Sequence, residues 1–219
     1  MELDIIQENQ GNYHRAVLLN ESVDAMNIQP DGIYVDVTMG AAGHTREILS
    51  RLTTGKLFSF DQDRDAWKNA PVDPKFTLIK ENFGDAKNWL RFHGVKKVNG
   101  LLADLGVSSH QFDTADRGFS FRFDGPLDMR MNHQSALTAS KVVNEYEVDA
   151  LIKIFRVYGE VEKPHVAAHK IVAARPVRTT QELIVALVGN DDWKEHHQFL
   201  AKVFQSLRIE VNQEMQVLE

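Results

Sequence analysis

Short β-rich runs alternate with amphipathic runs between residues 32 and 105, and this alternation restricts the fold more than any other feature of the chain. Such alternation is typical of βαβ units, in which each helix returns the chain so that the next strand joins a parallel sheet. The expected strands are Ile33–Val37, Lys56–Phe60, Phe76–Lys80 and Gly100–Leu105, and the expected helices between them are His44–Leu52, Arg64–Ala70 and Asp85–His93. The pattern predicts an α/β fold with a parallel sheet.

The second half of the chain lacks such strands. Residues 106–135 are rich in Gly, Ser, Asp and Phe, and we expect them to form a long irregular loop, a kind of segment that is usually functional or disordered. Helical periodicity then returns in Val142–Tyr146, Val148–Tyr158, Pro164–Ala174, Thr180–Val188 and a final apolar series from Phe199 to Leu218. We therefore expect a core domain at 1–106 and 198–219, and a loop and helical insertion at 107–197.

Composition excludes several classes of protein. The absence of cysteine excludes disulfides, thiolate nucleophiles and cysteine-based zinc sites. No apolar run reaches the roughly 18 residues of a membrane helix, and residues 1–11 are unlike a signal peptide, so we expect a cytoplasmic protein with no membrane partner. The net charge is −6, but residues 117–178 hold ten Lys or Arg against seven Asp or Glu, which leaves −9 elsewhere. Such a basic segment is typical of contact with a phosphate backbone and equally of a solvated helical face.

A turn with two glycines follows the first expected strand, in the sequence Tyr34-Val-Asp-Val-Thr-Met-Gly-Ala-Ala-Gly-His-Thr45. Small residues there let a ligand approach the backbone, and the helix that begins there presents free N–H groups. Gly40 and Gly43 alone do not complete the G-x-G-x-x-G dinucleotide signature. Asp61 ends the second strand at about the 20-residue offset where an acid binds ribose hydroxyls. Because nothing else in the sequence explains an acid there, we predict that Asp61 binds a ribose.

Other polar residues are weaker candidates. Asp104 ends the fourth strand, beside the point where strand order reverses in a doubly wound sheet. Asp63 and Asp65 are expected only to favour the first turn of the following helix. His165 and His169 share one helical face, but no H-E-x-x-H motif and no third ligand accompany them, so no metal site is predicted.

Arginines and phenylalanines alternate in the loop after Asp104. Guanidinium groups bind phosphates and aromatic rings stack on splayed bases, which is how proteins commonly recognise single-stranded RNA. The alternative is a hydrophobic cluster bordered by salt bridges. The residues expected to contact RNA are Arg117, Phe119, Phe121, Arg122 and Arg130, accompanied by Phe112 and Phe123.

Two motifs in this loop resemble a known family. Gly106-Val-Ser-Ser-His-Gln111 and Arg117-Gly-Phe-Ser-Phe-Arg-Phe-Asp-Gly-Pro-Leu-Asp-Met-Arg-Met131 are similar to motifs of the bacterial small-subunit rRNA cytosine-N4 methyltransferases, the RsmH or MraW family. The resemblance implies a Rossmann-like class I methyltransferase core, S-adenosylmethionine as cofactor, and a cytidine near the decoding site of 16S rRNA in the small ribosomal subunit as substrate. The positions that match the family's cofactor contacts are Ala42, Gly43, His44, Asp61, Phe83, Asp104 and Gln111, beside Gly40 of the turn.

The family interpretation also suggests where the substrate amine is held. Methyl transfer to an exocyclic nitrogen needs acceptors that aim its lone pair, and we expect Asp104, Ser108 and Ser109 to supply them. The family usually has a glycine at the position of Ala42. An alanine tolerates positive φ poorly, so either this turn has an ordinary backbone or the cofactor contact is altered.

The final helix reaches Glu219 without a Gly or Pro to end it, whereas the family continues into further strands. We therefore expect the last strands of the core sheet to be missing. A sheet ordered 3-2-1-4 would leave the fourth strand as an edge that is unpaired on one side, which predicts lower stability or a homo-oligomer. Two alternatives stay open: a nicotinamide-dependent oxidoreductase that shares the βαβ start and Asp61, and a catalytically impaired fragment that acts only as a cofactor- or RNA-binding module.

Overall fold

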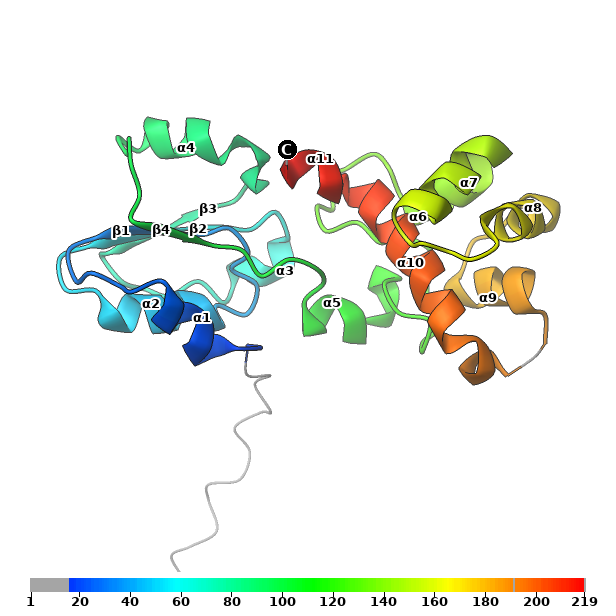
Figure 1. Ribbon diagram of the computed structural model, residues 1–219, viewed down its shortest axis with the longest axis horizontal. Coiled ribbons are helices and arrows are strands. Elements are labelled where there is room, and N and C mark those ends of the chain that lie inside the picture. Colours follow the sequence, from blue (N-terminus) through cyan, green and yellow to red (C-terminus); the bar gives the residue numbers. More distant parts are fainter. Residues whose placement is uncertain (1–15, 191, 219) are drawn as a thin grey trace, which may run out of the picture. The chain divides into compact units, whose positions relative to one another are not determined.

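The computed structural model describes residues 16–190 and 192–218 (Figure 1). The expected core-domain residues 1–15, together with Asp191 and Glu219, lie outside the described residues. Internal contacts divide the chain into two units. The sheet unit comprises the described residues up to Asp61, Ala66–Glu81 and Ala86–Asp104, and the helical unit comprises Gln62–Asp65, Asn82–Asp85 and the described residues from Leu105 onward.

Four parallel strands form the sheet, and they confirm the predicted Rossmann-like α/β core. The strands are β1 (Ile33–Asp36), β2 (Lys56–Phe60), β3 (Phe76–Ile79) and β4 (Gly100–Leu102). Their order is β3-β2-β1-β4, and the register pairs Val35 of β1 with Phe58 on one side and Leu101 on the other. The described residues add no further strand to this sheet, so β4 is an edge and Leu101 is half exposed. The carboxyl end of β1 lies between those of β2 and β4.

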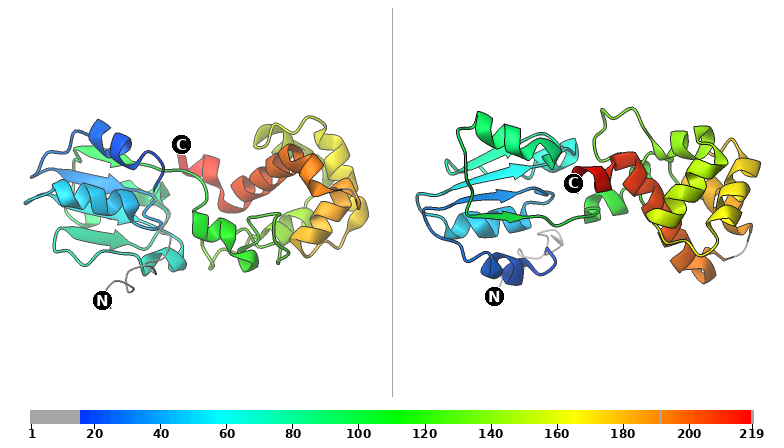
Figure 2. Two further views of the ribbon diagram at one scale, coloured as in Figure 1. Left: turned by 90° about the horizontal axis from the view of Figure 1, so that it is seen from below. Right: turned by 45° about the horizontal axis from the view of Figure 1, so that its top comes forward.

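Helices cover both faces of the sheet (Figures 1 and 2). They are α1 (Leu19–Ala25), α2 (Gly43–Arg51) and α4 (Ala86–Phe92). The short helix α3 (Arg64–Trp67) follows β2 in the sequence, and the 3-10 turn η1 (Phe83–Asp85) precedes α4. α4 lies on one face and α1 and α2 lie on the other. The apolar stripe of α2, with Ile48 and Leu49, packs against Tyr34 and Leu57 of the sheet. This arrangement is the doubly wound architecture that the alternating sequence pattern predicts.

The helical unit confirms the helices expected between residues 142 and 188. Its elements are α5 (Ser109–Asp113), η2 (Ala115–Arg117), α6 (Ala139–Glu145), α7 (Val148–Val157), α8 (Pro164–Ala174), α9 (Thr180–Val188), η3 (Trp193–His196), α10 (His197–Asn212) and α11 (Glu214–Leu218). No helix in the described ranges is long and apolar enough to cross a membrane.

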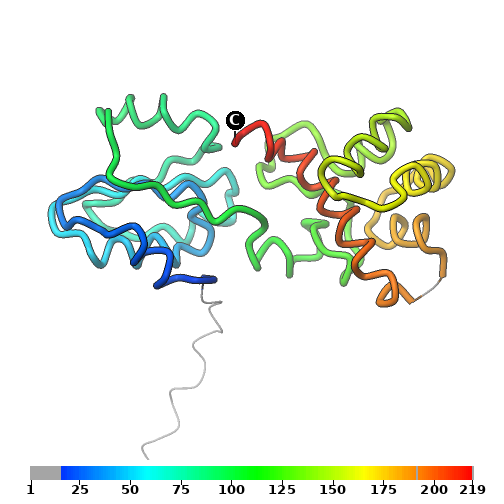
Figure 3. Tube along the Cα trace, in the orientation of Figure 1, coloured from blue at the N-terminus to red at the C-terminus, as the bar shows by residue number. Residues whose placement is uncertain are grey.

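The helix α10 packs with α6 and α7 inside the helical unit (Figure 3). Its buried Leu200, Val203 and Leu207 belong to the same apolar core as Leu151 and Phe155 of α7. This packing corrects the expected assignment of residues 198–219 to the core domain. The apolar periodicity showed only that the helix has a buried face, and it did not specify which neighbour covers that face.

Candidate functional site

A buried carboxylate organises the turn after β1. Asp36, the last residue of β1, is fully buried. Its Oδ1 accepts a hydrogen bond from the backbone N–H of Thr38 at 3.0 Å, and its Oδ2 accepts one from the Thr45 hydroxyl at 2.7 Å. Burial raises the pKa of Asp36, and the hydrogen bonds from Thr45 and Thr38 oppose that rise. Because Thr45 lies in the first turn of α2, Asp36 joins the end of the strand to the start of the helix.

The turn itself has a left-handed backbone at two positions. Gly40 has φ 51° and Ala42 has φ 62°. An alanine in this region is disfavoured by roughly 1–2 kcal/mol, and Ala42 is also fully buried. The alternative of an ordinary backbone at this turn is therefore wrong. The chain adopts the shape that a glycine would adopt, with a methyl group added.

His44 has a buried polar atom without a partner. The residue is 6% exposed, and its Nδ1 lies 4.0 Å from Oδ2 of Asp104. Its Nε2 is buried and has no hydrogen-bond partner among the described residues. Leaving a buried polar atom unpaired costs about 1–3 kcal/mol, so such an atom needs an explanation. A ligand that contacts Nε2 would supply one.

Two carboxylates follow the strands on either side of β1. Asp61 follows β2, and its Oδ2 accepts a hydrogen bond from the backbone N–H of Gly40 at 2.8 Å. This bond gives Asp61 a structural role in the turn, which corrects the inference that only a ribose explains an acid there. Asp104 follows β4; its N–H donates to the Thr38 hydroxyl at 2.8 Å, and its side chain is 55% exposed. The sheet unit thus brings together six of the predicted cofactor residues: Gly40, Ala42, Gly43, His44, Asp61 and Asp104.

The serine turn Ser108–Ser109 begins a short helix, α5, inside the expected irregular loop. Ser108 is its N-cap: the Ser108 Oγ accepts from the N–H of Gln111 at 3.2 Å, and the Gln111 Oε1 accepts from the N–H of Ser108 at 3.0 Å. This is a complete capping box, and the Ser-x-x-Gln signal for it was present in the sequence but not recognised. The Nε2 of Gln111 also donates a hydrogen bond to Asp63 at 2.6 Å, so both ends of the Gln111 amide are engaged.

The two remaining predicted cofactor residues, Phe83 and Gln111, belong to the helical unit. Phe83 is partly buried in η1. The cofactor contacts of both residues stay predictions.

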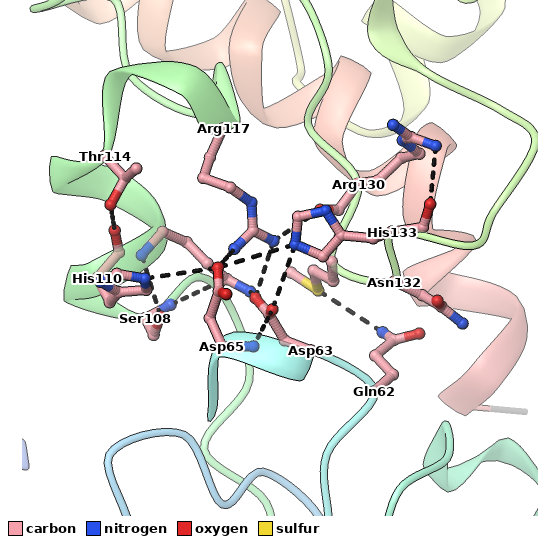
Figure 4. Close-up of polar contacts among 12 residues, drawn as sticks. Gln62, Asp63, Asp65, Ser108, His110, Thr114, Arg117, Arg130, Asn132 and His133 are labelled. Carbon is pink, nitrogen blue, oxygen red and sulfur yellow. Dashed lines mark hydrogen bonds and ion pairs between the residues drawn. The ribbon is translucent and has the colours of Figure 1, made fainter. Parts of the chain in front are cut away.

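Arg117 lies at the centre of a buried ionic network (Figure 4). It is 5% exposed; its Nη2 donates to Asp63 at 2.8 Å and its Nη1 donates to Asp65 at 2.7 Å. Phe119 and Phe121 are also buried, in the core of the helical unit. The expected RNA contacts of Arg117, Phe119 and Phe121 are therefore corrected. For these three residues the alternative holds, a hydrophobic cluster bordered by salt bridges.

The other two arginines of the loop differ from each other. Arg122 is exposed, and its guanidinium lies 5.0 Å from the centre of the Phe112 ring. The neighbouring Phe123 is 44% exposed. Arg130 instead binds Asp128 through Nε at 2.9 Å and Nη2 at 2.6 Å. Arg122, with Phe112 and Phe123, is the part of the predicted RNA surface that remains accessible.

Asp63 and Asp65 do more than favour a helix start. With His133 they form the one group in the described residues whose ligand atoms, all within 4.8 Å, have the spacing of a metal site. Arg117 already binds both carboxylates, so the network contains its own cation and we assign no metal to it. Burial would raise the pKa of Asp65, but the charge of Arg117, followed by those of His133 and His110, outweighs burial and lowers it.

The Asp128–Arg130 pair generates a pH-dependent prediction. Burial would raise the pKa of Asp128, but the hydrogen bonds and charge of Arg130 outweigh burial and lower it below 3.8. The stabilisation is therefore present above about pH 4 and is lost as the pH falls through the folded-state pKa. We expect Asp128→Asn to lower the free energy of unfolding by about 1–2 kcal/mol at pH 7, and the difference from wild type to shrink below pH 4.

Urea denaturation at pH 7, 5 and 3 measures this difference. Asp116→Asn, at an exposed aspartate in η2, is the control and should change stability little at any of these pH values. A deficit for Asp128→Asn that is the same at pH 7 and pH 3 would contradict the assignment.

Comparison with known proteins identifies the family. A sequence model described as the MraW methylase family matches residues 11–219. The ribosomal RNA small subunit methyltransferase H of Flavobacterium johnsoniae is 56% identical over 211 residues, which cover 94% of this chain and 70% of that protein. The protein of the same name from Bacteroides thetaiotaomicron is 53% identical over an alignment of 221 positions, which covers 98% of this chain and 72% of that protein. These matches confirm the resemblance of the loop motifs, and the chain belongs to the MraW methylase family of methyltransferases.

Proposed function

We propose that this chain transfers the methyl group of S-adenosylmethionine to the N4 atom of a cytidine in small-subunit rRNA. The observation that carries the proposal is the cluster at the carboxyl end of β1. There the left-handed turn at Gly40 and Ala42, the unpartnered Nε2 of His44, and the carboxylates of Asp61 and Asp104 occur together in a chain of a methylase family. The names of the relatives indicate small-subunit rRNA as the substrate class.

The residues of this cluster are of the types that can bind S-adenosylmethionine, which is a nucleoside with a positively charged sulfonium group. The carboxylate of Asp61, at the end of β2, is the group that ribose hydroxyls require at this edge of a parallel sheet. His44 offers an Nε2 that no group in the described structure satisfies. The cofactor, when bound, supplies an electrophilic methyl group on its sulfur. By the family resemblance, Phe83 and Gln111 complete the cofactor contacts.

The substrate amine needs hydrogen-bond acceptors that direct its lone pair toward the methyl group. Positioning and local electrostatics provide most of the rate in such a transfer, and no metal is required. Asp104 offers a half-exposed carboxylate for this role. Of the two serines, Ser109 is the better candidate, because the Ser108 hydroxyl oxygen already accepts the N–H of Gln111 as an N-cap.

Of the two alternative functions, the oxidoreductase is excluded and the non-catalytic binding module is still to be tested. Membership of a methylase family removes the nicotinamide-dependent oxidoreductase as an interpretation of the βαβ start. The chain covers 70% and 72% of the two relatives. A module that binds cofactor or RNA without transferring a methyl group is therefore the outcome against which the proposal has to be tested.

The proposed site should bind the cofactor through Asp61. Calorimetric titration with S-adenosylmethionine should show saturable binding, and Asp61→Asn should weaken it about 10- to 100-fold, as expected when a hydrogen bond to a charged group is lost. An asparagine still offers an oxygen to the N–H of Gly40, so the unliganded variant should remain folded.

Asp31→Asn, at an exposed aspartate before β1, is the matched control and should leave the affinity unchanged. NAD should not bind. Equal affinities for wild type and Asp61→Asn, or saturable NAD binding, would refute the assignment of this site.

The exposed Arg122 should contribute a phosphate contact to RNA binding. Arg122→Ala should weaken binding to a small-subunit rRNA fragment, and it should reduce the slope of log affinity against log salt by about 1, because one phosphate contact is removed. Fluorescence anisotropy at several salt concentrations measures both quantities. Arg91→Ala removes an exposed arginine of α4, outside the basic segment 117–178, and should change neither quantity. Identical slopes for wild type and Arg122→Ala would exclude Arg122 from the RNA surface.

A further inference from the structure

The side chain of Asp63 is connected to two segments of the helical unit that are far from it in the sequence (Figure 4). The residue is 3% exposed. Its Oδ2 accepts hydrogen bonds from the Nε2 of Gln111 at 2.6 Å and the Nη2 of Arg117 at 2.8 Å. Its Oδ1 accepts one from the backbone N–H of Asp65 at 3.0 Å. The Nε2 of His133 also lies 3.7 Å from Oδ1. These contacts together fix the orientation of the buried carboxylate.

The first connection from Asp63 leads to the serine turn. Gln111 donates to Asp63 with one end of its amide and accepts the N–H of Ser108 with the other. A rotation of this amide would break hydrogen bonds at both ends. The position of Ser108, and of Ser109 next to it, therefore depends on the carboxylate of Asp63.

The second connection leads to the segment Met129–Met131. Arg117 donates to the carbonyl of Arg130 at 2.9 Å, and the carbonyl of Arg117 accepts the N–H of Met129 at 2.9 Å. Met129 is fully buried and has φ 59°, a left-handed conformation that persists only where the surroundings impose it. Asn212 of α10 completes the constraint, since its side chain donates to the Met129 carbonyl and accepts the Met131 N–H, both at 2.7 Å.

We propose that Asp63 is a positioning residue for methyl transfer, which sets the placement of the Ser108–Ser109 turn relative to the Met129–Met131 segment. The inference rests on the proposed function, because that function assigns the substrate amine to the serine turn. Asp63 touches neither substrate nor cofactor in this role. Loss of its hydrogen bonds should therefore lower kcat by a larger factor than it weakens S-adenosylmethionine binding, because Asp63 holds only Gln111 among the proposed cofactor contacts.

The test begins with Asp63→Asn, which removes the negative charge and leaves one acceptor oxygen for donors that now bind two. We expect kcat on purified small ribosomal subunits to fall about 100-fold, the effect of a misplaced reacting group, and the calorimetric Kd for S-adenosylmethionine to rise by no more than about tenfold, the effect of one weakened hydrogen bond. Amide hydrogen exchange should become faster in α5 and in residues 129–131, where the loss of fixed contacts would allow local opening.

A double variant provides the rescue. Asp63→Asn combined with Gln111→Glu exchanges the carboxylate and the amide between the two positions. The exchange keeps the charge of the network, and a glutamate at this position of α5 preserves the capping box. We expect amide exchange in α5 to return to within about threefold of the wild-type rate, because residues in one hydrogen-bond network are energetically coupled.

Asp65→Asn is the matched control. It removes the neighbouring, more exposed carboxylate that binds the other arm of Arg117, and it leaves Gln111 in place. We expect kcat within about threefold of wild type, as is usual for a partly exposed ion pair.

Two results would overturn the proposal. One is equal kcat losses in Asp63→Asn and Asp65→Asn. The other is amide exchange in α5 that stays as fast in the double variant as in Asp63→Asn, although the melting temperature of the double variant matches wild type. If the wild-type chain binds S-adenosylmethionine but transfers no methyl group, the proposed function fails and amide exchange decides the placement role separately. Faster exchange in both segments of Asp63→Asn alone would then support that role, and unchanged exchange would overturn it.

Discussion

The buried ion pair between Asp63 and Arg117 is the interaction on which the loop after β4 depends. The two residues are 54 positions apart in the sequence and are 3% and 5% exposed. Breaking such a pair by removing one partner typically costs about 3–5 kcal/mol, because an uncompensated charge stays buried. The serine turn and the segment Met129–Met131 are each held through one of these two side chains. The pair therefore fixes the geometry of a segment that has little regular secondary structure of its own.

In the sheet unit, too, carboxylates hold the turns that follow the strands. Asp36, Asp61 and Asp104 end or follow three neighbouring strands, and their surroundings give them different roles. Asp36 is fully buried and holds the turn to α2. Asp61 binds the N–H of Gly40 with one oxygen, and Asp104 presents a half-exposed carboxylate. The three carboxylates lie near one another because a parallel sheet brings the carboxyl ends of its strands to one edge. Their different burial lets one of them hold the turn while another stays accessible.

The sequence predicted the regular elements well, because periodicity and turn residues are local signals. All four strands and the helices from 142 to 188 lie in the predicted segments, although β4 ends at Leu102 and not at Leu105. The strand order is the one considered above for an edge at the fourth strand. Long-range partners were not predictable in the same way. Whether Arg117 binds a phosphate or a buried aspartate depends on Asp63, and no local pattern reports that contact. The packing partner of α10 and the left-handed backbone of Ala42 are likewise consequences of the assembled fold. The capping box of α5 could have been found, since Ser-x-x-Gln is a local signal.

The central claim is that this chain methylates the exocyclic amine of a cytidine in small-subunit rRNA. Incubation of the purified chain with small ribosomal subunits and S-adenosylmethionine carrying a labelled methyl group, followed by nuclease digestion and mass spectrometry of the nucleosides, tests it most directly. The account predicts that the label appears in N4-methylcytidine and in no other nucleoside. Label in a different nucleoside, or no label from a folded chain that binds the cofactor, would contradict it.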